Sequence, residues 1–166
     1  MSETDALVHN AAQHAVAAGD GAPMRPARRV AVVTCMDARV NPYRILGLRD
    51  GDAHILRNAG GIVSDDVLRS LAVSQRMLGT EEVVVIHHTG CGVLGYSDIE
   101  WRASLAAETG SEPPWSCEVT ADVDANVRAG LQRIRTSPFL AAATSVRGFV
   151  YDVEDRTLRE VVPVQS

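Results

Sequence analysis

Apolar residues in this chain follow two periods, and each period predicts a different kind of element. Short apolar runs at residues 30–34, 53–57 and 82–87 have the length and composition of buried strands. Two alternating segments, residues 148–153 and 157–162, flank a short polar turn and predict an antiparallel hairpin. The chain is therefore expected to contain five strands.

Helical periodicity, with apolar residues every three or four positions, occupies most of the sequence between these strands. Helices are predicted over residues 2–18, 42–46, 65–78, 97–109 and 121–136. In the third of them, the inward face is predicted to consist of Val67, Leu71, Val73, Ser74, Met77 and Leu78. Because helices alternate with strands, we predict an α/β fold with a mostly parallel β-sheet flanked by helices and a C-terminal antiparallel hairpin.

Length and charge narrow the class of protein. The chain has 166 residues, which suits one domain spanning residues 1–166. A net charge of −5 without a basic run argues against a nucleic-acid partner. The apolar runs are far shorter than the ~20 residues of a membrane span, and the acidic N-terminus does not resemble a signal peptide. Three cysteines do not predict a disulfide framework, so we expect a cytoplasmic protein.

The N-terminal helix is predicted to be amphipathic. Leu7, Val8, Ala11, Ala15 and Val16 share one of its faces, and a glycine- and proline-rich segment follows it. We expect the helix within residues 1–20 to pack on a partner subunit, because its apolar face would otherwise lie at the end of a flexible linker.

Reactive side chains cluster where the first and third predicted strands end. Cys35 ends the first strand, Asp37 and Arg39 follow it at alternate positions, and His88 and Cys91 follow the third. Right-handed crossovers place these two strands side by side, with their carboxyl ends at the edge where α/β proteins bind ligands. Two thiolates and an imidazole are zinc ligands, and a fourth tetrahedral position left for water is typical of a catalytic site. We therefore predict a zinc site formed by Cys35, His88 and Cys91.

Two alternatives concern the ligands themselves. Cys35 and Cys91 are also compatible with small buried hydrophobic residues, as free cysteines often are. Strand alternation points His87 and His88 to opposite faces, so one of them at most belongs to the site. His88 is predicted to be the ligand because it has the tighter spacing to Cys91, and His87 is predicted to pack within the strand.

A third alternative is a dinucleotide-binding loop. Residues 90–95 match the pattern G-x-G-x-x-G after a strand. However, the next helix begins late, and Pro113-Pro114 occupies the segment in which a second strand with a terminal acid is required. This sequence context argues against dinucleotide binding.

Asp37 and Arg39 share a face with Cys35 in an extended segment. One interpretation is a surface ion pair of little energetic consequence. The functional interpretation is that Arg39 holds the Asp37 carboxylate in a bidentate pair. Asp37 then either accepts a hydrogen bond from the metal-activated water or occupies the fourth zinc position itself. We predict both residues to be catalytic and leave these two roles of Asp37 open.

Three motifs, in this order and at these separations, resemble the β-class carbonic anhydrases, in particular the short bacterial and archaeal members: Cys35-Met36-Asp37-Ala38-Arg39, Arg57-Asn58-Ala59-Gly60 and His88-Thr89-Gly90-Cys91-Gly92. The resemblance covers about residues 30–95 and continues weakly through residues 145–149. It implies a zinc enzyme that reversibly hydrates carbon dioxide to bicarbonate and a proton. It also implies Cys35, His88 and Cys91 as ligands, Asp37 and Arg39 as a catalytic dyad, and a homodimer or homotetramer.

The resemblance also leaves two points open. Plant-type members carry a glutamine shortly before the first cysteine, whereas residues 23–26 of this chain contain none, so the group that holds the substrate is not identified. Related hydrolases of carbonyl sulfide and carbon disulfide share the three ligands, which makes these substrates the main alternative. A non-catalytic zinc-binding module is the lesser alternative, and bound zinc without hydration activity would distinguish it.

Overall fold

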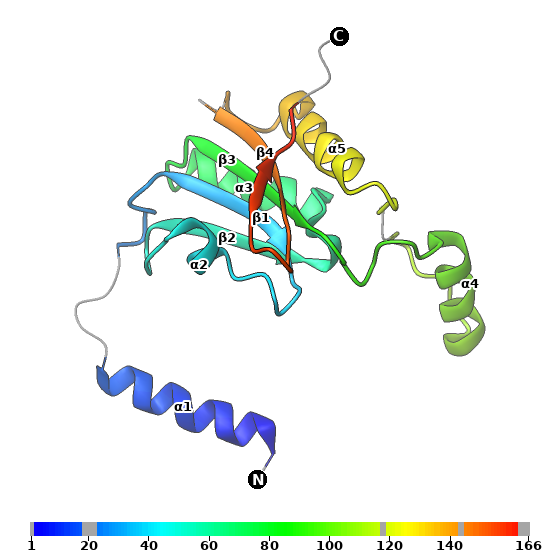
Figure 1. Cartoon of the computed structure of the whole chain (residues 1–166), viewed down its shortest axis with the longest axis horizontal. Coiled ribbons are helices and arrows are strands. Elements are labelled where there is room, and N and C mark those ends of the chain that lie inside the picture. The colour runs from blue at the N-terminus through cyan, green and yellow to red at the C-terminus, as the bar shows by residue number, and fades with distance from the viewer. Residues whose placement is uncertain (1, 18–22, 117–118, 143–144, 163–166) are drawn as a thin grey trace.

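The structure is a computed structural model that describes residues 2–17, 23–116, 119–142 and 145–162, without the side chains of residues 14–17. Five strands form one sheet in the order β2-β1-β3-β4-β5 (Figure 1). Their bounds are β1 Val30–Cys35, β2 Ala53–Asn58, β3 Glu82–His88, β4 Ser145–Tyr151 and β5 Leu158–Glu160. The first four strands are parallel, and β5 pairs antiparallel with β4. The predicted fold class is confirmed.

The strand order brings the two chemically reactive segments together. β1 lies between β2 and β3, with Thr34 opposite Ile86 in the β1–β3 register. The Thr34 hydroxyl donates a hydrogen bond of 2.9 Å to the Ile86 carbonyl and adds a side-chain tie to this pairing. The expected adjacency of the first and third strands is therefore confirmed, and both end at the same edge of the sheet.

One face of the sheet is covered by two long helices, α3 (Asp65–Arg76) and α5 (Val123–Thr136) (Figure 1). Alternate residues of the strands point toward these helices and are buried with them, as period-two side-chain alternation requires. The main core includes Ala31, Val33, Val83, Val85 and Val150 from the strands and Val67, Leu71, Val127, Leu131 and Ile134 from the helices. This core fixes β1 and β3, whose ends carry the reactive residues.

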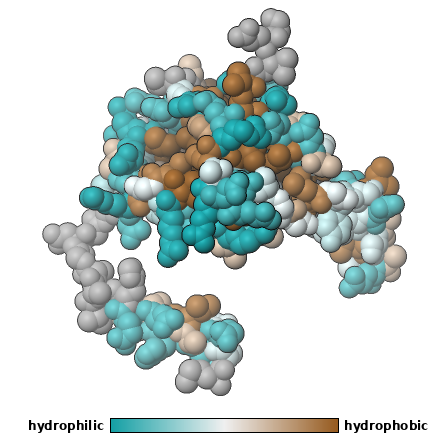
Figure 2. Space-filling view, viewed as in Figure 1, coloured by the Kyte–Doolittle hydropathy of each residue, from teal (hydrophilic) through white to brown (hydrophobic). Residues whose placement is uncertain are grey.

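The other face of the sheet is covered less completely. The short helix α2 (Pro42–Leu46) packs there against a smaller cluster that includes Val32 and Ile86. Side chains of Val84 and Phe149 on the same face are only partly buried. Figure 2 accordingly shows apolar residues gathered on the viewer's side of the molecule, over the sheet. This face therefore leaves apolar surface in contact with solvent in the isolated chain.

The predicted inward face of α3 is partly wrong. Val67 and Leu71 are buried, but Val73 and Met77 are 39% and 69% exposed. The second half of the helix buries Ser74, as predicted, and also Gln75, which was not predicted to face inward. Both are polar residues with internal partners: the Ser74 hydroxyl lies 2.8 Å from that of Thr80, and the Gln75 amide oxygen accepts a hydrogen bond from the backbone of Ala141.

Two helices, α1 (Glu3–Ala17) and α4 (Asp98–Thr109), lie apart from the sheet (Figure 1). Leu7 and Val8 of α1 are each 65% exposed, whereas the predicted contributions of Ala15 and Val16 lie outside the described side chains. Packing of α1 on a partner subunit stays a prediction. Within the described parts of the chain, the helices are all too short or too polar to cross a membrane.

Candidate metal centre

Cys35 is the last residue of β1 and is 3% exposed. β1 is a central strand of valines and alanine that fills both cores, so its carboxyl end has little freedom to move. In the β1–β2 register Cys35 lies opposite Asn58, and the next backbone N–H, that of Met36, donates to the Asn58 carbonyl at 2.9 Å. The sheet therefore holds the Cys35 sulfur at a defined place on its carboxyl edge.

His88 ends β3 beside it and is 1% exposed. Its Nδ1 lies 2.9 Å from the Thr89 carbonyl oxygen, and because a carbonyl can only accept, Nδ1 must carry the proton. Nε2 then presents a lone pair, and it is buried without a hydrogen-bond partner among the described residues. An imidazole that donates through one nitrogen and offers the other is the usual arrangement of a metal-ligating histidine.

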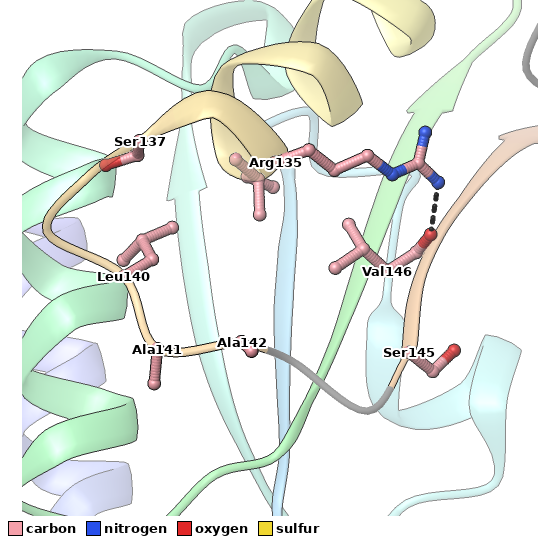
Figure 3. Close-up of a pocket in the computed structure, with 8 residues that line it drawn as sticks. Arg135, Ser137, Leu140, Ala141, Ala142, Ser145 and Val146 are labelled. Atoms are coloured by element: carbon pink, nitrogen blue, oxygen red, sulfur yellow. Dashed lines mark hydrogen bonds between the residues drawn. The ribbon is translucent and has the colours of Figure 1, made fainter.

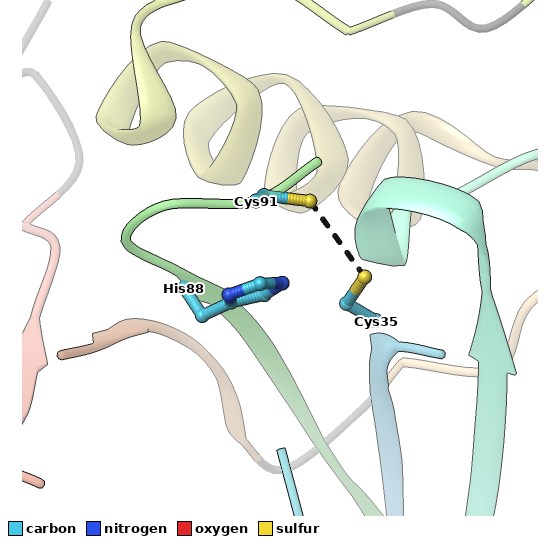
Figure 4. Close-up of side chains that lie close together, drawn as sticks. All are labelled: Cys35, His88 and Cys91. Carbon is cyan, nitrogen blue, oxygen red and sulfur yellow. Dashed lines mark hydrogen bonds between the residues drawn. The ribbon is translucent and has the colours of Figure 1, made fainter. Parts of the chain in front are cut away.

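Cys91 completes the cluster from the loop after β3. Gly90 adopts a left-handed conformation with φ of 59°, and this turn brings the chain back toward the end of β1. The Cys91 and Cys35 sulfurs are 3.8 Å apart, and the His88 ring points toward them (Figure 4). One ligand atom from each of the three residues lies within 4.8 Å of the others.

The spacing of these atoms fits zinc. Two Zn–S bonds of ~2.3 Å at the tetrahedral angle separate their sulfurs by about 3.8 Å, which is the separation found here. Burial raises the pKa of the Cys35 thiol, but the proximity of the His88 ring and backbone hydrogen bonds outweigh it and lower that pKa to about 7. Burial raises the pKa of the Cys91 thiol. Because zinc binds the thiolate form, its binding is expected to release protons from this pair.

Asp37 and Arg39 form a bidentate ion pair beside the cluster. Arg39 Nε donates to Asp37 Oδ1 at 3.0 Å, and Nη2 donates to Oδ2 at 2.7 Å. The Arg39 backbone N–H adds a 2.9 Å bond to Oδ1. The guanidinium holds the pKa of Asp37 well below its usual range, so the carboxylate stays ionised. Asp37 Oδ2 lies 3.8 Å from His88 Nε2, which places the carboxylate next to the three ligand atoms.

Arg39 also connects the two loops that carry the cluster. Its Nη2 donates a 2.8 Å hydrogen bond to the carbonyl oxygen of Gly90, the residue before Cys91. One side chain therefore ties the segment after β1 to the segment after β3. The sequence predicted the pair with Asp37 but gave no indication of this second contact.

Arg57, in β2, is a functional candidate to which sequence reasoning assigned no role. Its Nε donates to the Cys35 carbonyl at 2.9 Å and its Nη2 to the Asp37 carbonyl at 2.7 Å. The guanidinium thus spans Met36 and fixes the backbone on both sides of it. The sequence pointed to Arg57 only through its place in one of the three motifs. It could not predict the two hydrogen bonds, because they depend on how the side chain lies across the neighbouring strand.

The structure separates His87 from the cluster. His87 is 3% exposed, and burial lowers its pKa to about 4, so its ring is neutral near pH 7. Its Nε2 is also buried without a partner among the described residues, but it lies outside the group of three ligand atoms. The position of His88 supports the predicted choice between the two histidines.

The glycine-rich loop does not form a dinucleotide site. α4 begins at Asp98, capped by the Ser97 hydroxyl, eight residues after Gly90 in the numbering of the chain. The loop that would contact a pyrophosphate instead presents Cys91 to Cys35. Cys117, the third cysteine of the chain, lies outside the described residues.

A separate cavity of about 300 Å³ lies at the opposite edge of the sheet, between the end of α5 and the start of β4 (Figure 3). Arg135 closes one side of it by donating a 2.9 Å hydrogen bond to the Val146 carbonyl. Since the reactive residues lie at the carboxyl ends of the strands and this cavity lies at the amino end of β4, the cavity is not part of the metal centre.

Comparison with known proteins places the chain in a family. Residues 30–104 match the sequence pattern of the family described as carbonic anhydrase. The chain is 46% identical over 163 residues to beta-carbonic anhydrase 1 of Mycobacterium tuberculosis, a match that covers 98% of this chain and 100% of that protein. The crystal structure of a carbonic anhydrase from Streptococcus mutans matches with a TM-score of 0.86 at 38% identity, covering 98% of this chain and 99% of that one.

A more distant relative bears a different name. A carbon disulfide hydrolase from an Acidianus species is 34% identical over 161 residues, covering 80% of this chain and 77% of that protein. Both the identity and the coverage are lower than for the mycobacterial carbonic anhydrase. The chain therefore belongs to the β-class carbonic anhydrases, and its cluster of Cys35, His88 and Cys91 is typical of the zinc site of that family.

Proposed function

We propose that this enzyme catalyses the reversible hydration of carbon dioxide to bicarbonate and a proton, with Cys35, His88 and Cys91 as zinc ligands and Asp37 and Arg39 as catalytic residues. The observation that carries the proposal is the buried, unpartnered Nε2 of His88 beside two sulfurs whose 3.8 Å separation suits tetrahedral zinc. A bound zinc ion supplies the Lewis acidity that makes water nucleophilic near neutral pH.

Side chains next to the three ligands position the water molecule that reacts. Asp37 is ionised and can only accept hydrogen bonds, so it positions a water molecule on the side of the cluster that it faces. Of the two roles left open for Asp37, its pairing with Arg39 favours the acceptor over the fourth ligand, because both carboxylate oxygens already bind the guanidinium. Arg57 holds the backbone that carries Asp37 in register with Cys35.

The alternative substrates are carbonyl sulfide and carbon disulfide, since a relative named carbon disulfide hydrolase is 34% identical. One zinc-loaded preparation should be assayed on carbon dioxide, carbonyl sulfide and carbon disulfide by stopped-flow and sulfide detection. We expect carbon dioxide hydration to be the fastest reaction. Sulfide release without carbon dioxide hydration would contradict the proposal, and bound zinc without turnover of any of the three would support the non-catalytic module.

We further propose that residues 1–166 act as one zinc domain that assembles as a homodimer or homotetramer in the cytoplasm. The incompletely covered sheet face and the exposed Leu7 and Val8 of α1 support assembly, because both leave apolar side chains exposed in the isolated chain. Free thiols at Cys35 and Cys91 support a reducing compartment.

A further inference from the structure

A second cavity, of about 570 Å³, lies between α2 and the β4–β5 hairpin. Its polar lining side chains are those of Arg39, Asn41, Arg44, Tyr151 and Arg156. No Asp or Glu is among the described residues that line it. Arg39 is already paired with Asp37, so Arg44 and Arg156 are the lining guanidinium groups whose charge no lining residue balances.

The lining offers hydrogen-bond donors rather than acceptors. The Asn41 side-chain oxygen already accepts from the Arg44 backbone as the cap of α2, which leaves the Asn41 amide as a donor. Arg39 uses Nε and Nη2 on Asp37 and Gly90, which leaves Nη1. The guanidinium groups and the Asn41 amide nitrogen can only donate, and the Tyr151 hydroxyl can also donate, so a complementary ligand must supply acceptors.

Arg44 and Arg156 are the two groups best placed to bind such a ligand. Within the described part of the chain, neither guanidinium has a hydrogen bond or ion pair that would occupy it. Arg156 has φ of 59°, the left-handed conformation by which the turn after β4 reverses the chain toward β5. The two side chains come from different elements, α2 and the hairpin turn, and converge on one cavity.

The apolar part of the cavity lining indicates which kind of anion would fit. Ile45, Val153 and Leu158 contribute carbon surface beside the guanidinium groups. The volume lies within the ~300–1,000 Å³ usual for small-molecule pockets, which is more than one inorganic anion needs. An organic body against these side chains and an oxyanion against the arginines would use both parts of the lining.

We propose that this cavity binds a small organic oxyanion, a phosphate monoester or a carboxylate, through Arg44 and Arg156. Both oxyanions match the planar fork of arginine, which binds them through two parallel hydrogen bonds. Arg39 lines both this cavity and the metal centre, but Arg44 and Arg156 belong to the cavity alone, and binding to it can be measured without any assay of hydration.

The test is calorimetric titration of the zinc-loaded protein with phenyl phosphate and with benzoate, using phenol as the uncharged control. The variant R44Q/R156Q removes the two guanidinium groups. R25Q/R69Q is the matched control, since it removes the same charge from two exposed arginines outside this cavity. We expect at least one oxyanion to bind the wild type and R25Q/R69Q equally well, phenol to bind neither, and R44Q/R156Q to bind at least about tenfold more weakly.

The relative affinities of phenyl phosphate and benzoate then identify the preferred oxyanion. R44K/R156K keeps the charge without the fork, so it should bind with intermediate affinity. Equal affinity in R44Q/R156Q and R25Q/R69Q would place the anion at the metal or elsewhere and overturn the proposal. Absence of binding by both oxyanions, as expected if a second copy of the chain fills the cavity, would also overturn it.

Discussion

Replacing Gly61 by alanine should disturb the metal centre through the backbone of β1. Gly61 ends the short 3-10 turn Ala59–Gly61 and has φ of 68°. A Cβ atom at this position would lie 2.9 Å from the backbone nitrogen of Cys35 and 3.0 Å from the carbonyl carbon of Thr34. Because β1 is hydrogen-bonded to a strand on each side, it cannot move away from the new methyl group without disturbing the sheet.

The expected loss of unfolding free energy in Gly61→Ala is the sum of two separate costs. A left-handed conformation costs a residue with a side chain about 1–2 kcal/mol relative to glycine, and overpacking in a tightly packed region adds about 1–3 kcal/mol. Gly79 provides a matched control, since it has φ of 76° but an added Cβ there would meet no atom within 4 Å. We therefore expect Gly79→Ala to lower the free energy of unfolding by about 1–2 kcal/mol, and Gly61→Ala to lower it by about 2–5 kcal/mol.

Urea unfolding of zinc-free samples measures this difference, and a chelator competition measures zinc affinity. Gly61→Ala should bind zinc more weakly than the wild type because Cys35 is displaced, whereas Gly79→Ala should bind it with unchanged affinity. Equal losses of unfolding free energy in the two variants, together with unchanged zinc affinity in Gly61→Ala, would refute the claim that the turn positions the ligand.

Three further predictions concern the surroundings of the cluster. Arg57→Lys replaces the two-pronged guanidinium by a single ammonium, so the variant should keep its zinc but lose about tenfold in kcat/KM. An unchanged rate, or an unchanged spectrum of the cobalt-substituted enzyme, would contradict the proposal that Arg57 positions the backbone of Cys35 and Asp37 through its two hydrogen bonds. Hydration should rise toward alkaline pH, and Arg39→Ala should move the onset higher because the freed carboxylate then competes with hydroxide; identical pH–rate profiles for wild type, Arg39→Ala and Asp37→Asn would show that the pair has no catalytic role. Deleting residues 1–20 should weaken the oligomer in sedimentation, and a fully stable oligomer would exclude a role of α1 in assembly.

The metal centre was predictable from sequence because it depends on backbone topology. Parallel strands that are neighbours end at the same edge of the sheet, so a cysteine after one strand and a histidine after the next had to meet. The tight His88–Cys91 spacing then identified the third ligand and distinguished His88 from His87. These inferences needed only the order of strands and the alternation of side chains along them.

Features that depend on side-chain conformation were not predictable. The two hydrogen bonds of Arg57 run from its side chain to the backbone at the end of the neighbouring strand, and such contacts leave no periodic pattern in the sequence. In α3, Gln75 is buried because its amide oxygen accepts a hydrogen bond from Ala141, a partner distant in the sequence. Apolar Val73 in the same helix and Met77 at its C-cap are exposed. Hydrophobic pattern alone therefore overestimated the apolar face of that helix.

The central claim is that Cys35, His88 and Cys91 hold a catalytic zinc ion. It is tested most directly by measuring zinc content and carbon dioxide hydration together in the wild type, His88→Ala and His87→Ala. We expect about one zinc per chain in the wild type, zinc retention in His87→Ala, and loss of both zinc and hydration in His88→Ala. Full zinc content in His88→Ala with loss of zinc from His87→Ala would contradict the assignment of the site.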